Sequence, residues 1–396
     1  MGEHLDEKSM HDSSESSVMQ VSSNGTQQKV KAIEDACERL DFEALVELAT
    51  STGGLLTDEL RRRACENDLQ GASRKAWETL PRHPDEDQVQ LDVDRAFVYY
   101  PRDQSEQALQ EKKEQLSDLI VSTLRKHPLL SYFQSYHDVV QVLLLVLGQN
   151  RAAHAVPRMS LFRLRDYMLP TIVPARKHFE LVSAVVSIAD PELANHIAEA
   201  ENSFALSATH SLFAHDIQDY REIARLYDFL LAHEPVMSIY LFATITISRR
   251  AELLELEPDE SDILTYMIAK LPQNLDIDTL ATNTVRLFES HPPESLRGFL
   301  WWRLSSYSVL KTSRDIKASQ PLEKAEALGR KQIQQLRSEE LMKRRFLLLC
   351  KYRRPLTSLT AALVVAALSL YLRRTGQDLS LRSLFAWATR LLLRRE

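Results

Sequence analysis

The chain has 396 residues, 44% of them hydrophobic, and its 9 glycines together with abundant Leu, Ala, Glu and Arg favour helix over sheet. The three cysteines, Cys37, Cys65 and Cys350, are far apart and fit neither a disulfide framework nor a metal-ligand spacing. Residues 343–396 contain 12 Lys and Arg against 2 Asp and Glu, or +10, so the net charge of −6 leaves −16 on the rest of the chain. This acidic body argues against nucleic acid as the main partner.

The first residues read as a polar leader followed by a helix. Residues 1–28 are Ser-rich and predict disorder, with no apolar stretch that would serve as a secretory signal. Asp6 stands where an N-myristoylation site needs Ser or Thr. Apolar residues at helical spacing then predict one helix over residues 29–50.

The central part of the chain reads as helix after helix. Segments such as "DYREIARLYDFLLAHEP" end at prolines, and neither sustained strand alternation nor a repeat of 20–50 residues is present. We therefore predict an all-α fold with one large domain over residues 52–300. A charged helical linker, residues 301–345, is expected to follow it.

The C-terminal region predicts a membrane anchor. Residues 355–372, "PLTSLTAALVVAALSLYL", are uncharged and would span about 27 Å as a helix, with Lys or Arg on both sides. A buried core helix is the alternative. Residues 379–395 predict an amphipathic helix lying in the membrane interface, or pairing with the first segment as a hairpin.

Several chemical functions lack their motifs. The sequence has no phosphate-binding loop, no dinucleotide-binding glycine motif, no H-E-x-x-H and no G-x-S-x-G. The twelve histidines are scattered, and His210 and His215 are badly spaced for sharing a metal. We expect no metal and no cofactor held by this chain itself.

Two polar clusters remain. In the first, Asp92 and Arg95 are three residues apart and can touch on a helix, either as a surface ion pair or to aim the arginine at a partner's anion. The second, "YFQSYHD", begins a long apolar helix at Tyr132. Its Gln134 can orient a water molecule with its carbonyl while its amide donates, although such residues also serve as ordinary helix starts.

These clusters resemble the motifs of the TBC-domain Rab GTPase-activating proteins. Val89-x-x-Asp92-x-x-Arg95 resembles the family's I-x-x-D-x-x-R, and Tyr132-Phe133-Gln134 its Y-x-Q-G. "RLYDFLL", which contains Arg225 and Asp228, resembles R-[IL]-[WY]-D-x-x-L, and "GGLLTDELRRR" with "RKAWETL" resembles a divided R-x-x-x-W block. The four motifs occur in the family's order, and the fuller stretches resemble the branch anchored in the endoplasmic reticulum.

Two departures from the family pattern stand out. Ser135 replaces the motif glycine, a residue that permits positive φ or close approach of the backbone. The opening block is interrupted by "ACENDLQGAS" between Arg63 and Arg74, as a tolerated loop or an error in the gene model. This interruption affects the expected packing of Trp77.

The resemblance implies a mechanism in which a GTP-bound Rab brings GTP and Mg²⁺ and this chain hydrolyses no nucleotide itself. Arg95 would neutralise charge on the transferring phosphoryl group, and Gln134 would position the attacking water. Asp92 would orient Arg95, and Tyr132 would hold the glutamine segment. Ser135, Arg225 and Asp228 would support the site.

The branch resemblance further implies a catalytic domain on the cytosolic face of the endoplasmic reticulum membrane, acting in traffic to the Golgi. The sequence does not name the Rab. A non-catalytic Rab-binding membrane adaptor is the alternative, which Ser135 favours; a helical membrane scaffold is a third.

Overall fold

The computed structural model describes residues 25–65, 76–102, 104–200, 205–315 and 320–375. The chain divides into two compact units, Met1–Ile333 and Gln334–Glu396. Helices and short turns make up the regular structure of the described residues, with no strand among them, so the all-α prediction is confirmed there. The helices in chain order are α2 (Phe42–Thr50), α3 (Asp58–Ala64), α4 (Glu86–Asp94), α5 (Glu106–Lys126), α6 (Tyr136–Met159), α7 (Val173–Ala189), α8 (Pro191–His196), α9 (Leu206–His210), α10 (Tyr220–Ala232), α11 (Met237–Ser248), α12 (Arg250–Leu254), α13 (Ser261–Ala269), α14 (Ile277–Ser290), α15 (Leu300–Arg303), α16 (Val309–Thr312) and α17 (Leu322–Thr375).

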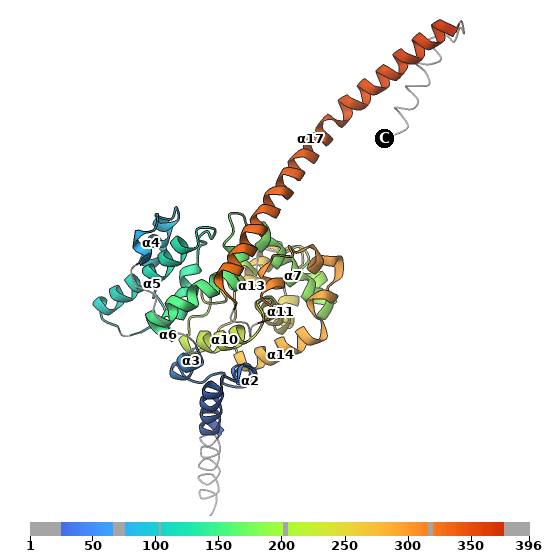
Figure 1. The fold of residues 1–396 in the computed structure, drawn as a ribbon. Helices are drawn as coiled ribbons and strands as arrows, with labels where there is room; N and C mark the ends of the chain where they lie inside the picture. Colours follow the sequence, from blue (N-terminus) through green and yellow to red (C-terminus); the bar gives the residue numbers. More distant parts are fainter. Residues whose placement is uncertain (1–24, 66–75, 103, 201–204, 316–319, 376–396) are drawn as a thin grey trace, which may run out of the picture. The chain divides into compact units, whose positions relative to one another are not determined.

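The core of the first unit forms around α6 and α11. Helix α5 packs on α6 at one side, whereas α7 and α14 pack on α11 at the other, and α10 contacts both α6 and α14 (Figure 1). The stretch Tyr136–Tyr167 is apolar and long enough to cross a membrane, but 56% of its most apolar 18 residues are buried in the protein. This stretch is therefore a core element of the unit.

The predicted helix over residues 29–50 is divided in the structure. Residues 25–39 are helical, Leu40 has a φ of 54°, and α2 begins at Phe42. The Asp41 carboxylate accepts a hydrogen bond from Ala44 N at 3.0 Å and so caps α2 as a new helix. Residues 25–28 belong to the first helix rather than to a disordered leader; the remainder of that predicted leader lies outside the described residues.

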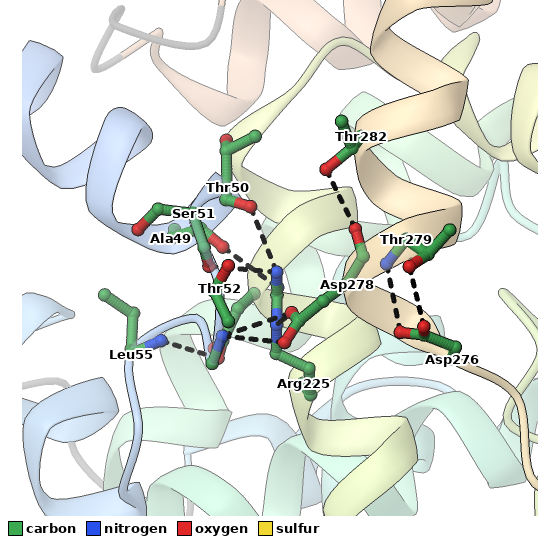
Figure 2. Close-up of polar contacts among 12 residues, drawn as sticks. Ala49, Thr50, Ser51, Thr52, Leu55, Arg225, Asp276, Asp278, Thr279 and Thr282 are labelled. Carbon is green, nitrogen blue, oxygen red and sulfur yellow. Dashed lines mark hydrogen bonds and ion pairs between the residues drawn. The ribbon is translucent and has the colours of Figure 1, made fainter. Parts of the chain in front are cut away.

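Arg225 on α10 ties α2 to the rest of the first unit (Figure 2). Its guanidinium donates to the carbonyl oxygens of Ala49, Thr50 and Ser51 at 3.0, 3.0 and 3.1 Å. It also pairs with Asp278 on α14 at 2.8 Å. The last carbonyls of a helix have no partner within the helix and attract cations, so one buried arginine satisfies the end of α2.

Asp228, one turn further along α10, fixes the following segment. Its carboxylate accepts from Leu55 N at 2.9 Å and from Arg61 Nε and Nη2 at 2.8 and 2.9 Å. Gly54 passes between these groups with a φ of +56°, and a Cβ there would collide with the Asp228 carboxylate and lie 2.8 Å from Arg225 Cδ. Glycine is therefore required at this position for both conformation and space.

The first unit continues beyond the predicted boundary at residue 300. Trp301, Val309 and Leu310 are 3%, 0% and 2% exposed, in a stretch predicted to be a linker. Buried Asp166 holds this stretch, since it accepts from Val309 N at 3.3 Å and from Gln332 Nε2, near the start of α17, at 2.9 Å. The compact unit consequently ends at Ile333, and these long-range contacts have no local sequence signal.

The predicted membrane segment, residues 355–372, lies within α17. The side chains of Leu363, Val364 and Leu370 are 61%, 65% and 68% exposed. Ala362–Tyr371 is a shorter apolar helix segment, and Tyr136–Tyr167 is the stretch of the described residues that meets the length and composition of a membrane span. The predicted helix over residues 379–395 lies outside the described residues.

Gly54→Ala should destabilise the protein strongly because it adds both strain and a collision with the Arg225–Asp228 group. Gly298→Ala is the matched control, since Gly298 also has positive φ (+74°) but its nearest atom to a new Cβ is 3.8 Å away. The control should cost about 1 kcal/mol, and Gly54→Ala roughly 3 kcal/mol or more, as for breaking a buried ion pair. Denaturant unfolding followed by circular dichroism measures both; equal losses would contradict the collision.

Candidate functional site

Asp92 and Arg95 do not form the predicted pair. Asp92, on α4, is 4% exposed, and its carboxylate accepts from Gln88 Nε2 at 3.0 Å and Tyr132 Oη at 2.9 Å. Arg95 is the residue that ends α4; its Nε donates to Leu91 O at 3.2 Å and its side chain is exposed. The prediction that Asp92 orients Arg95 is wrong, because Asp92 faces the interior while Arg95 lies beyond the last helical turn.

Tyr132 joins the two predicted motifs instead. Its hydroxyl donates to Asp92 and lies 3.2 Å from His137 Nδ1, and its backbone N donates to Asp85 Oδ2 at 2.8 Å. Burial, together with the Asp92 carboxylate, holds the pKa of Tyr132 well above its ordinary value, so the phenol stays a hydrogen-bond donor. Since Asp92 precedes Arg95 by three residues and Tyr132 precedes Gln134 by two, this bond brings the two segments together.

Gln134 and Ser135 form the turn that starts α6. Gln134 is exposed, whereas Ser135 is 6% exposed and has φ 75° and ψ −1°, in the left-handed region. The Ser135 side chain makes no capping hydrogen bond to the helix. The conformation explains why the related motif carries glycine here, since a side chain at positive φ is strained.

Two histidines, His210 and His215, hold the glutamine segment, and no sequence pattern predicted these contacts. His210 on α9 places Nε2 3.1 Å from the carbonyl oxygen of Gln134 and Nδ1 2.8 Å from that of Ser207. Its ring lies 5.1 Å from the ring of Phe133. A neutral imidazole can donate to one of these carbonyls and an imidazolium to both, although burial lowers the pKa of His210.

His215 contacts the same segment through Asp138. Its Nδ1 lies 2.8 Å from Asp138 Oδ2 in the first turn of α6, and this hydrogen bond raises the pKa of His215. From the sequence, the spacing of His210 and His215 indicated only that they would not share a metal ion; it did not indicate these contacts with the glutamine segment. In the described residues, no group of three or more His, Cys, Asp or Glu is placed to hold a metal ion.

The surface beside Arg95 is partly apolar. Leu91, Val98 and Tyr99 are 53%, 74% and 43% exposed. An exposed guanidinium and an exposed amide thus belong to two segments that a partly buried hydrogen bond joins. This arrangement suits a site that acts on an anion and a water molecule supplied by a bound partner.

Arg225 and Asp228 belong to a different part of the first unit. Their hydrogen bonds described above go to residues 49–61 and Asp278, so their support is to the fold rather than to Arg95 or Gln134. Trp77 packs partly against the core, with the Arg125 guanidinium 5.4 Å from its ring. Most of the interruption "ACENDLQGAS" lies outside the described residues.

Comparison with known proteins gives one family. Residues 47–254 match the sequence model of the Rab-GTPase-TBC domain, a range that includes Arg95, Gln134, Arg225 and Asp228. The chain is 35% identical over 268 residues to TBC1 domain family member 20 of Bos taurus, covering 65% of this chain and 66% of that one. For the Homo sapiens protein of the same name, the identity is 35% over 265 residues, covering 65% of each chain.

A fungal relative and a solved structure agree with this match. The GTPase-activating protein gyp10 of Schizosaccharomyces pombe is 30% identical over 287 residues, covering 69% of this chain and 76% of that one. The structure of a Chlamydomonas flagellar RabGAP TBC domain matches with a TM-score of 0.50 at 13% identity, covering 65% of this chain and 90% of that one, which shows a shared fold. The alignments to the two mammalian relatives span slightly less than two thirds of their length.

Ser135→Gly should stabilise the protein by roughly 0.5–1 kcal/mol, because glycine removes the strain of positive φ at some cost in chain entropy. Ser135→Ala is the control: it removes the hydroxyl but keeps the strain, so it should leave stability close to that of the wild type. Thermal unfolding of the three proteins measures the difference. Destabilisation by both substitutions would assign the hydroxyl a role of its own.

Proposed function

Because the chain belongs to the Rab-GTPase-TBC domain family, we propose that it accelerates GTP hydrolysis by a Rab GTPase in trans. The observation that carries this proposal is the Tyr132–Asp92 hydrogen bond, which couples the segment of Arg95 to that of Gln134. The relatives named as GTPase-activating proteins support it as well. In this proposal the Rab brings GTP and Mg²⁺, and no cofactor resides in this chain.

The two exposed side chains have complementary tasks. Negative charge spreads over the transferring phosphoryl oxygens, and the guanidinium of Arg95 offers a fork of donors to neutralise it. The side chain of Gln134 can accept from and donate to the attacking water, which orients it. An arginine finger typically contributes about 10³–10⁵ in rate, or roughly 4–7 kcal/mol.

The remaining residues of the site position these two. Asp92 holds Tyr132 rather than Arg95, and Tyr132 and His210 fix the backbone that carries Gln134. A Rab-binding adaptor without catalysis is the second candidate, and the strained Ser135 favours it, because strain in this turn can displace the glutamine. The two candidates differ in whether Rab binding is accompanied by faster hydrolysis.

We also propose that α17 anchors the protein, with residues 355–372 in the membrane of the endoplasmic reticulum and the catalytic domain in the cytosol. The exposed apolar side chains between Ala362 and Tyr371 and the flanking basic residues support this. The Rab would then be one acting between the endoplasmic reticulum and the Golgi. Enzyme and lipidated substrate on one surface meet at a raised effective concentration.

Arg95→Ala and Gln134→Ala should each reduce stimulated GTP hydrolysis at least tenfold, since each removes a group that acts only during the reaction. Arg95→Lys should restore little of the activity lost in Arg95→Ala, because an ammonium group cannot donate to two phosphoryl oxygens at once as a guanidinium can. Single-turnover hydrolysis by a panel of Rabs measures this with the full chain in detergent. Arg221→Ala, an exposed arginine on α10, is the control and should match the wild type.

Unchanged activity in both alanine variants would reject the two-finger mechanism. Rab binding by the wild type without any stimulation of hydrolysis would instead favour the adaptor.

Full-length protein should stay in the membrane pellet after extraction with alkaline carbonate. The double substitution Val364→Arg and Leu368→Arg should move it to the supernatant, because each arginine near the centre of a span costs on the order of 2.5–3.5 kcal/mol. The exposed Leu341→Arg and Met342→Arg lie outside the proposed span and form the control pair. Wild-type protein in the supernatant would contradict a spanning anchor.

A further inference from the structure

One stretch of the acidic first unit is basic and aromatic. Residues 295–314, "SLRGFLWWRLSSYSVLKTSR", contain four Lys or Arg and no Asp or Glu, although the chain before residue 343 carries −16 in total. The stretch also contains Phe299, Trp301 and Trp302 within four positions. Neither the proposed catalysis nor the proposed anchor uses these residues.

The stretch is firmly attached, yet two of its aromatic side chains point to solvent. Trp301 and Leu304 are 3% and 5% exposed and belong to the core of the first unit. Phe299 and Trp302, by contrast, are 75% and 63% exposed. Large apolar side chains exposed three residues apart on a well-packed segment are characteristic of a contact surface.

The backbone that presents Phe299 is strained. Gly298 and Phe299 follow one another with φ of 74° and 54°, both in the left-handed region. Positive φ is rare for a bulky aromatic residue, and strain of this kind is concentrated at functional positions. The exposed ring thus sits at a costly position without gaining burial in return.

Three cations lie in or against the backbone segment that carries the two rings. Arg297 and Arg303 are exposed and have no ion-pair partner within the part of the chain that the structure describes. Lys177 on α7 donates to the carbonyl oxygen of Arg303 at 3.1 Å and adds a third cation. The nearby carboxylates of Glu234 and Glu294 are engaged by Arg314, so they do not neutralise these three.

We propose that the surface formed by Phe299, Trp302, Arg297, Arg303 and Lys177 docks on an anionic lipid bilayer. Aromatic rings favour the boundary between headgroups and acyl chains, and cations beside them attract anionic headgroups. A four-residue helix and its turn form too small a platform for a specific protein interface, which usually buries about 800 Å² per partner.

Such docking would give the domain a contact with the membrane that is separate from α17. It would also restrain the rotation of the domain relative to the bilayer. A lipidated substrate could then reach the candidate site only from a limited range of directions. This inference stands without the proposed GTPase activation, because it rests on exposure, charge and backbone strain alone.

Hydrogen exchange of the full chain tests the proposal, since its readout is local and independent of the anchor. Amides of residues 297–304 should be protected by vesicles of phosphatidylcholine with phosphatidylserine, not by phosphatidylcholine alone, and the protection should weaken with added salt. Helix α13, whose Tyr266 is 62% exposed, is the internal control, and the exchange of its amides should not change with either kind of vesicle. Equal protection by neutral vesicles, or none by either kind, would overturn the proposal; the second result would point to a protein partner.

Substitutions complete the test. Arg297→Gln with Arg303→Gln should raise the vesicle concentration for half protection roughly tenfold or more, since each cation at an anionic surface contributes about fivefold. Phe299→Ala with Trp302→Ala should abolish the protection, whereas Tyr266→Ala should leave it unchanged. All these side chains are exposed, so circular dichroism should show the wild-type fold. Wild-type protection in both double variants would also overturn the proposal.

Discussion

The hydrogen bond from Tyr132 to Asp92 joins two segments that lie 40 residues apart in the chain, and the geometry of the candidate site depends on it. Arg95 and Gln134 are both exposed, and each lies at the end of a helix, where backbone position is least constrained by the helix itself. A buried carboxylate and a phenol that stays protonated provide the missing constraint. The exposed groups remain able to meet a partner, while the backbone behind them is fixed.

The histidines extend the same principle. His210 approaches the carbonyl of Gln134 from α9, and His215 approaches Asp138 in the first turn of α6. Both come from residues more than 70 positions further along the chain. The turn at Ser135 is therefore held from three directions, which is consistent with a backbone that retains positive φ without glycine.

Buried polar groups also organise the rest of the first unit. Arg225 and Asp228 attach α2 and the segment that follows it. The Asp166 carboxylate forms hydrogen bonds with His178, Val309 and Gln332. His178 and Arg165 lower the pKa of Asp166 to about 2, although burial alone would raise it. The described residues of this domain form no sheet, so such groups specify which helix ends meet, because apolar packing alone is not directional.

The sequence by itself determined the helical class and the family resemblance, and it singled out Arg95 and Gln134 as candidates, because apolar periodicity and motif spacing are local properties of the chain. It could not determine the partner of Asp92. The three-residue spacing allowed a contact with Arg95, whereas nothing local indicates a contact with Tyr132, which lies 40 residues away. Two other features were missed for a related reason. The break at Leu40 depends on the Asp41 cap that starts a new helix, and the extension of the compact unit to Ile333 depends on the distant carboxylate of Asp166. Tertiary structure decided these points, because a hydrogen bond between remote segments depends on how helices pack in space, and no periodicity along the chain records it.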